Sequence, residues 1–250
     1  MTSPSTQWLH RARAQTLFEA RMILRNGEQL MVTIIFPIAL LILLSTTDLV
    51  DIDTAGAAKI DVLAPGILAA AMMTTAFTSQ AIATAFDRRN GVLRLMATTP
   101  LGKSGLLAGK IAGVFAVEIV QIALIVPIAL VLGWNPSLHG IVGALGIWIL
   151  GTIAFTALAM LVAGVLRAEA VLAVANLVLA ALIVGGGVIA PVAQLPDPLR
   201  TLALFLPSGA MGEALRGAFN AAGVPAFSVV ILLAWSTALG WGVTRLFKWN

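Results

Sequence analysis

The chain of 250 residues contains 60% hydrophobic and only 10% charged residues, and its mean hydropathy is +1.01. A water-soluble domain carries roughly 25% charged residues, so the composition excludes a soluble enzyme or a disordered protein and predicts a membrane protein. The formal net charge is +4, but the positions of the basic residues indicate membrane topology rather than nucleic-acid binding. Because the chain has no cysteine, a disulfide framework, a thiolate nucleophile and an iron–sulfur cluster are excluded.

The first 29 residues are predicted to form a cytoplasmic helix lying along the membrane surface. Read as a helix, residues 8–25 place apolar side chains such as Leu9, Leu17 and Leu24 on one side and arginines on the other. This pattern is typical of interfacial amphipathic helices. A solvated basic tail is the alternative. The arginines in this stretch argue against a signal peptide.

Residues 30–250 are predicted to form one transmembrane domain with six spans. A helix needs about 20 mostly apolar residues to cross the hydrocarbon core. The charge-poor runs place the spans at 30–47, 63–86, 111–132, 141–166, 170–190 and 224–244. Gly133-Trp134-Asn135-Pro136 is a turn signal that separates the third span from the fourth. The predicted fold class is therefore an all-α membrane protein with six transmembrane helices.

The basic residues predict the orientation of these spans. With the N-terminus inside, the outer segments hold only Lys59, Arg200 and Arg216 of the 15 Lys and Arg residues. Because Lys and Arg are enriched in cytoplasmic loops, both termini are predicted to face the cytoplasm.

Polar residues within the spans have two interpretations. The second and fifth spans carry the candidates Thr74, Thr75, Thr78, Ser79 and Asn176. Such groups either line a transport pathway or form hydrogen bonds across helices and to their own backbone.

Glu118 is the only charge well inside a predicted span. An ionisable residue within a membrane is a functional candidate by default. The alternative is a buried structural carboxyl that is hydrogen-bonded to a neighbouring helix, or one that reaches the inner interface.

Catalytic and metal sites are not expected in this chain. His10 and His139 lie far apart in the sequence without a nearby carboxylate cluster, so neither a zinc nor an iron site is predicted. The segment from Ala97 to Ser104 fits a relaxed Walker A pattern. A phosphate loop requires an α/β domain around it, and no polar stretch is long enough to form one. We expect no ATP hydrolysis by this chain and no enzymatic activity.

The predicted inner loop, 87–104, carries the sequence DRRNGVLRLMATTPLGKS. It resembles the short inner loop of the ATP-binding-cassette (ABC) type-2 permeases, an exporter family of six-span subunits. The matching residues are Arg88, Arg89, Gly91, Leu93, Leu95, Thr99, Pro100 and Leu101. Val92 and Arg94 depart from the family pattern, in which Thr and Glu are common at these positions.

The predicted outer segment, 191–223, is rich in proline and glycine and poor in charge. It is similar to the family's segment before the last span, which re-enters the outer leaflet as short helices. Glu213 and Arg216 within it stand three residues apart and would pair on one helix face.

The resemblance implies a non-catalytic, multi-pass permease subunit of an ABC exporter in the plasma (inner) membrane. Its implied partners are separate ABC ATPase subunits and a second permease chain, identical or homologous, within membrane lipid and without nucleic acid. This chain would hold no cofactor, since ATP and Mg²⁺ are bound by the ATPase. The residues implied to receive the ATPase stroke are Arg88, Arg89, Gly91, Arg94, Thr99, Pro100 and Leu101. The pathway would lie between protomers and be lined by spans one, two and five.

The aromatic content predicts the class of substrate. Polysaccharide exporters in the family commonly use aromatic side chains for stacking, but this chain has no Tyr, and spans one, two and five offer only Phe36, Phe77 and Phe86. An apolar wall with scattered hydroxyls favours a hydrophobic or amphiphilic compound, such as a drug, an antibiotic-like metabolite or a lipid. The alternative is an ATPase-independent channel or secondary transporter for a small solute, which would need a continuous polar lining or midplane ionisable groups.

Overall fold

A computed structural model describes most of the chain. The described residues are 16–17, 21, 25–49, 52, 54, 56–97 and 102–247. The surface helix predicted within residues 1–29 therefore lies almost entirely outside the described residues. The part of the chain that the structure describes is helical, without a strand, so the all-α fold class is confirmed.

Five helices of the described chain are long and apolar enough to cross a membrane. They are Lys59–Arg89, Ala108–Val131, Leu138–Val165, Ala168–Gly185 and Ala226–Leu246, and they correspond to the predicted spans two to six. The predicted first span is a shorter apolar helix, Met31–Thr46. It consists of the π-helical segment η1 (Met31–Ile35) and α3 (Phe36–Thr46), and α2 (Gly27–Leu30) directly precedes it. The count of six crossings stays a prediction.

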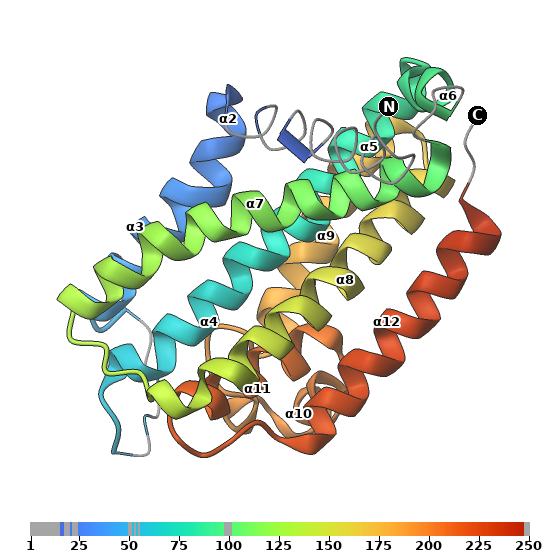
Figure 1. Cartoon of the computed structure of the whole chain (residues 1–250). Helices are drawn as coiled ribbons and strands as arrows, with labels where there is room; N and C mark the ends of the chain where they lie inside the picture. Colours follow the sequence, from blue (N-terminus) through green and yellow to red (C-terminus); the bar gives the residue numbers. More distant parts are fainter. Residues whose placement is uncertain are drawn as a thin grey trace, which may run out of the picture.

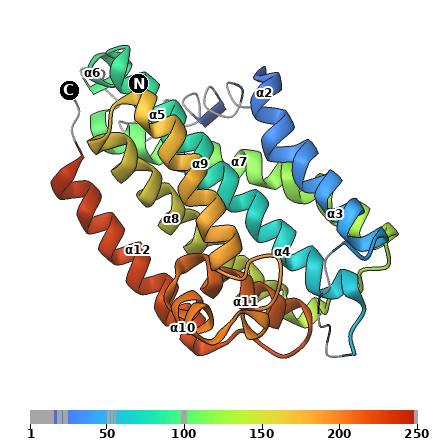
Figure 2. The same cartoon turned by 180° about the vertical axis from the view of Figure 1, so that it is seen from behind.

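The second predicted span is the central helix of the molecule. It runs without a break through α4 (Lys59–Met73), the π-helical segment η2 (Thr74–Ser79) and α5 (Gln80–Arg89). Of its most apolar window 94% is buried, against 17–44% for the other four candidate spans. Both views show α4 between α3 on one side and α8 on the other (Figures 1 and 2), and α9 packs against η2 and α5 farther along the same helix.

Four further long helices complete the bundle. They are α7 (Gly102–Val131), α8 (Ile141–Val165), α9 (Ala168–Gly185) and α12 (Ala226–Leu246). α8 contacts the central helix, and α12 packs against the other side of α8 (Figure 1). The 3₁₀ turn η3 (Leu138–Gly140) leads into α8.

Short helices lie at the two ends of the bundle (Figure 1). α6 (Val92–Ala97) follows α5 at one end, whereas η4 (Val192–Gln194), α10 (Asp197–Phe205) and α11 (Pro207–Phe219) lie at the other. α11 packs against α4, α8 and α12. A Cβ at Gly140 would collide with the carbonyl oxygen of Ala218, so glycine allows the start of α8 to touch the end of α11.

The buried apolar side chains form two clusters. One gathers around Phe77, Phe155 and Met211, where the central helix meets α8 and α11. The other gathers around Leu41 and Ile67 and joins α3, α4 and α7. Ile122 and Phe219 are packed against both clusters; the cavity described below lies beside them.

Candidate functional site

A buried ion pair joins α5 to α7 at the α6 end of the bundle. The Nζ of Lys110 lies 2.9 Å from Oδ2 of Asp87, and Lys110 is fully buried. Gln80 donates a hydrogen bond of 3.3 Å to the backbone carbonyl of Lys110. Because a buried charge is costly without a partner, Asp87 stabilises the passage of α7 beside α5.

The two arginines at the end of α5 contact the α8–α9 connection. Arg88 donates hydrogen bonds to the carbonyl oxygens of Gly164 and Leu166, at the end of α8. A cation at this place also complements the helix dipole. Arg89 places Nη1 2.6 Å from Oε1 of Glu169, which lies in the first turn of α9. These residues of the predicted coupling loop thus hold the chain's own helices together.

Gly91 ends α5 and permits the turn into α6. Its φ of +74° lies in the left-handed region that favours glycine, and its N–H bonds the carbonyl of Arg88 at 3.1 Å. In α6, Leu93 is buried, whereas Arg94 and Leu95 are exposed. Of the other predicted coupling residues, Thr99, Pro100 and Leu101 lie outside the described residues.

Gln121 in α7 connects the two π-helical segments. Its Nε2 donates to the carbonyl of Thr33 in η1 at 2.6 Å, to Oγ1 of Thr75 in η2 at 2.8 Å and to the carbonyl of Ala71 at 3.3 Å. Pro37 lacks the N–H that would bond the Thr33 carbonyl in a regular α-helix. The amide of Gln121 therefore satisfies an acceptor that proline exposes.

The hydroxyl residues of the second span lie inside the chain. Thr74, Thr75, Thr78 and Ser79 are all buried. Thr74 donates to the carbonyl of Ala70 in its own helix at 2.7 Å. Asn176 is instead exposed on α9 and donates to the carbonyl of Leu172 at 2.8 Å. The four hydroxyl residues are buried in one segment of the central helix, whereas Asn176 is exposed on α9; their part in a pathway stays a prediction.

Glu118 is fully buried between α7 and α8. Its Oε2 accepts hydrogen bonds from Nε1 of Trp148 at 2.7 Å and from Oγ1 of Thr152 at 2.8 Å. Trp148 and Thr152 are four residues apart and so share one face of α8. Phe115 packs edge-on against Trp148, with ring centroids 5.3 Å apart. Glu118 thus ties the two helices together.

Glu213 and Arg216 of α11 form the ion pair that their spacing predicts. Nη2 of Arg216 lies 2.8 Å from Oε1 of Glu213. The same guanidinium donates to the carbonyl oxygens of Gly187 and Val188 at 2.7 and 2.8 Å, and Glu213 accepts from the N–H of Val192 at 2.9 Å. The pair holds the turn after α9 against α11.

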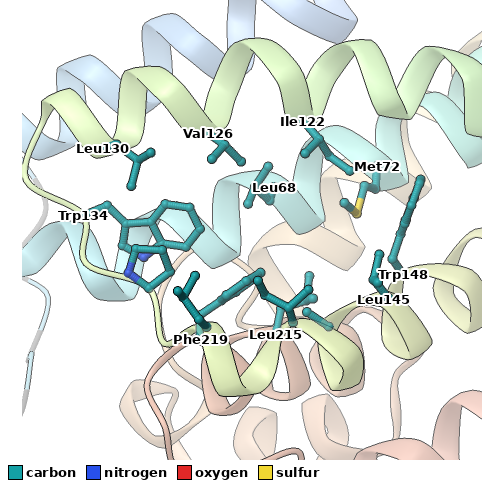
Figure 3. A pocket seen from close by; sticks show the side chains of 14 residues that line it. Leu68, Met72, Ile122, Val126, Leu130, Trp134, Leu145, Trp148, Leu215 and Phe219 are labelled. Carbon is teal, nitrogen blue, oxygen red and sulfur yellow. The ribbon is translucent and has the colours of Figure 1, made fainter.

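A cavity of about 350 Å³ lies between α4, α7, α8 and α11. Figure 3 shows Trp134 and Trp148 at opposite ends of it, with Ile122 on the α7 side and Leu215 on the α11 side. The lining side chains are apolar or aromatic. This volume falls within the range of small-molecule sites.

A comparison with known protein families gives a match that covers most of these helices. The model of the ABC-2 type transporter matches residues 13–220, which include every described helix from α2 through α11. The chain belongs to the ABC-2 type transporter family. It is thus a multi-pass membrane protein and a transmembrane permease component of an ABC transporter, as the loop resemblance predicted. No curated protein matches this ABC-2 chain.

Two features of this ABC-2 permease are not apparent from its sequence. The sequence allowed a hydrogen bond between Glu118 and a neighbouring helix but did not identify Trp148 and Thr152 as its partners, and the partners of Gln121 lie 46 to 88 residues away in the chain. The cavity had no sequence signal, because residues that line a cavity and residues that face lipid are equally apolar.

Proposed function

We propose that this chain is the permease subunit of an ABC exporter that moves a hydrophobic or amphiphilic compound out of the cytoplasm or the inner leaflet. Membership of the ABC-2 family carries the proposal. A separate ATPase supplies the energy by binding ATP and Mg²⁺, since the polar segments of this chain are too short for a nucleotide-binding domain.

The proposed orientation places the α6 end of the bundle in the cytoplasm of a plasma (inner) membrane. That end holds the basic ends of α5, α8–α9 and α12, to which Arg88, Arg167 and Arg245 belong. Lys59 and Arg216 lie on helices at the opposite end. This distribution supports cytoplasmic termini by the positive-inside rule. In this orientation, α10 and α11 are the proposed re-entrant helices of the outer leaflet.

α6 is the proposed contact for the ATPase. Arg88 and Arg89 are engaged by the chain's own α8 and α9, whereas Arg94 and Leu95 of α6 are exposed. An exposed cation beside an exposed leucine suits a protein interface. Movement of α6 would reach α8 and α9 through the arginines of α5.

The proposed pathway lies between two permease chains, identical or homologous. α9 is the least buried of the candidate spans and exposes Leu172, Asn176 and Leu177. Such an apolar face with a few polar groups suits an amphiphile better than a sugar polymer.

Copurification tests the proposal. The tagged chain is extracted from its native membranes in mild detergent, and the complex is reconstituted in vesicles. We expect an ABC ATPase to copurify and its ATP hydrolysis to be stimulated by lipophilic dyes more than by lipid-linked glycans. Solute movement by the purified chain alone, without ATP, would favour the channel or secondary transporter instead.

A further inference from the structure

We infer that Glu118 is a proton-binding site, whose carboxyl group holds a proton on Oε1 while α7 and α8 are packed together. The ligand is a single proton, and its binding stabilises the contact between the two helices. The inference goes beyond the proposed function, because it depends neither on the ATPase nor on the transported compound.

The carboxyl group of Glu118 is enclosed by neutral groups. Glu118 is 0% exposed, and its two hydrogen bonds come from Trp148 and Thr152, which both donate to Oε2. Oε1 is buried as well and has no hydrogen-bond partner among the described residues. Two neutral donors on one oxygen stabilise a buried negative charge only in part. Binding of a proton to Oε1 removes that charge.

Among the described residues, the helices that pack against α7 bring no charge to Glu118. α3, η1, η2 and α8 contain no Asp, Glu, Lys or Arg. The charged residues of the other elements beside α7 stand at the ends of α4 and α5 and in α6, and they are Lys59, Asp61, Asp87, Arg88, Arg89 and Arg94. On α7 the nearest charge is Lys110, eight residues or about 12 Å along the helix, and it pairs with Asp87.

Asp87 and Glu213 show how this chain accommodates an ionised carboxylate within the bundle. Asp87 lies 2.9 Å from Nζ of Lys110, and Glu213 lies 2.8 Å from Nη2 of Arg216. In such a pair the opposite charges offset the cost of removing each from water. At Glu118 the neutralising group is a proton instead of a basic side chain.

A proton on Glu118 also supplies a hydrogen-bond donor where acceptors are in excess. Oε1 of Gln121 is a buried acceptor with no partner among the described residues. Gln121 stands three residues after Glu118, and residues at this spacing are neighbours on a helix surface. An ionised Glu118 adds only acceptors to this place, whereas the carboxylic acid adds an O–H donor. The protonated form therefore agrees better with the rule that buried polar atoms are hydrogen-bonded.

Proton binding and the packing of α7 on α8 are linked. The proton is taken up from water when the helices pack and returns to water when they separate, because a solvated glutamate has a pKa of about 4.3 and is ionised at neutral pH. The packed form thus holds one proton more than the separated form. Its stabilisation by this proton is complete at low pH and is lost as the pH rises.

Infrared spectroscopy tests the inference on the full chain. The chain is purified in dodecyl maltoside, a detergent without a carbonyl group, and the C=O stretching band of protonated carboxyl groups is recorded at pH 7. We expect this band in the wild-type chain and its loss in Glu118→Gln, which keeps the size of the side chain. Glu213→Gln is the matched control and should keep the band, because Glu213 is paired with Arg216.

The pH dependence of unfolding in the same detergent is the second measurement. The packed form holds a proton that the unfolded form releases above pH 4.3, so each pH unit between 5 and 7 should raise the unfolding equilibrium constant of the wild-type chain about tenfold. This rise should be missing from Glu118→Gln, where position 118 does not titrate. Any pH dependence that the two proteins share belongs to other groups.

Three results would overturn the inference: no carboxylic-acid band in the wild-type chain at pH 7, a band that persists in Glu118→Gln, or the same pH dependence of unfolding in both proteins. If Glu118→Gln does not fold, the wild-type chain labelled with ¹³C at its glutamate carboxyl groups replaces it. The band should then shift to lower frequency, and an unshifted band would also overturn the inference.

Discussion

The side-chain amide of Gln121 links three helices: α7, the first apolar helix and the central helix. It donates to acceptors in η1, α4 and η2, and each of these acceptors is enclosed by protein. Hydrogen bonds between transmembrane helices average about 0.6 kcal/mol, so the three together contribute about 2 kcal/mol, against roughly 5–15 kcal/mol for the unfolding of a whole domain.

Replacement of this amide tests its contribution. We expect Gln121→Leu to lower the free energy of unfolding in detergent by about 2 kcal/mol, because three acceptors lose their donor. Asn176→Leu is the matched control. This substitution removes an exposed amide that bonds only its own helix, so the free energy of unfolding should change by less than about 0.5 kcal/mol. Equal losses in the two variants would contradict a special role for Gln121.

At the scale of residues, the sequence predicts local pairs and misses distant ones. Glu213 and Arg216 were predicted because three residues along a helix bring two side chains together. Gln121 lies 88 residues from Thr33, and no spacing rule joins helices so far apart. Pro37 carried a partial signal, since a proline within an apolar helix always frees one carbonyl.

At the scale of elements, α6 is a separate short helix with one buried side, which packs on the bundle, and one exposed side, which is the proposed contact for the ATPase. Leu93 anchors it, while Arg94 is exposed. The arginines of α5 have a structural role, because Arg88 bonds the end of α8 and Arg89 bonds the first turn of α9.

Substitutions of the arginines separate the role of α6 from that of α5. In the complex with its ATPase, Arg94→Glu should lower transport-coupled ATP turnover severalfold and leave the melting temperature of the isolated permease unchanged. Arg88→Gln should lower that melting temperature, since the carbonyls at the end of α8 lose their donor. Unchanged turnover in Arg89→Glu/Arg94→Glu would count against the proposed contact.

The close contact between α4 and the turn after α9 can be tested by adding a methyl group to a glycine of α4. A Cβ at Gly66 of α4 would collide with the carbonyl oxygen of Val188, whereas one at Gly146 of α8 meets nothing within 4 Å. We expect Gly66→Ala to destabilise the permease by about 1–3 kcal/mol and Gly146→Ala to be neutral or stabilising by up to about 1 kcal/mol. Thermal unfolding of both variants in one detergent would measure the difference.

Hydropathy predicts where helices are, but not how they end or distort. The fifth span was predicted to reach 190, yet α9 ends at Gly185. Val188 and Ile189 continue the apolar run but lie in a turn beneath α11, which Gly187 permits with a φ of +62°. Apolar residues in a buried turn and in a span have the same composition, so the boundary needed the tertiary structure.

On the scale of the whole molecule, the absence of cysteine from the sequence makes the proposed topology directly testable. Asn90 follows α5 and Asn220 follows α11, and both are exposed. In intact cells, an impermeant thiol reagent should label Asn220→Cys and should label Asn90→Cys only after permeabilisation. The reverse pattern would invert the membrane orientation.

The bounds of the first span, 30–47, agree with the helix Met31–Thr46 to within one residue at each end, although its crossing of the membrane stays a prediction. A charge-free run of the right length stands out in a chain with 10% charged residues. The first run begins with the π-helical segment η1, and the apolar helix that it forms with α3 is shorter than the five candidate spans. The prediction that this helix crosses the membrane therefore depends on the distribution of basic residues and not on the length of the helix.

The enclosure of the central helix has a consequence for biogenesis. This helix is the least apolar of the five candidate spans and the most buried, so its threonines and glutamine meet lipid until the later helices arrive. During synthesis α8, α9 and α11 emerge from the ribosome after α4 and α5, because they follow them in the chain. A permease truncated after α7 would keep α3 and α7 against its most polar span but would lack α8, α9 and α11, which cover the rest of it.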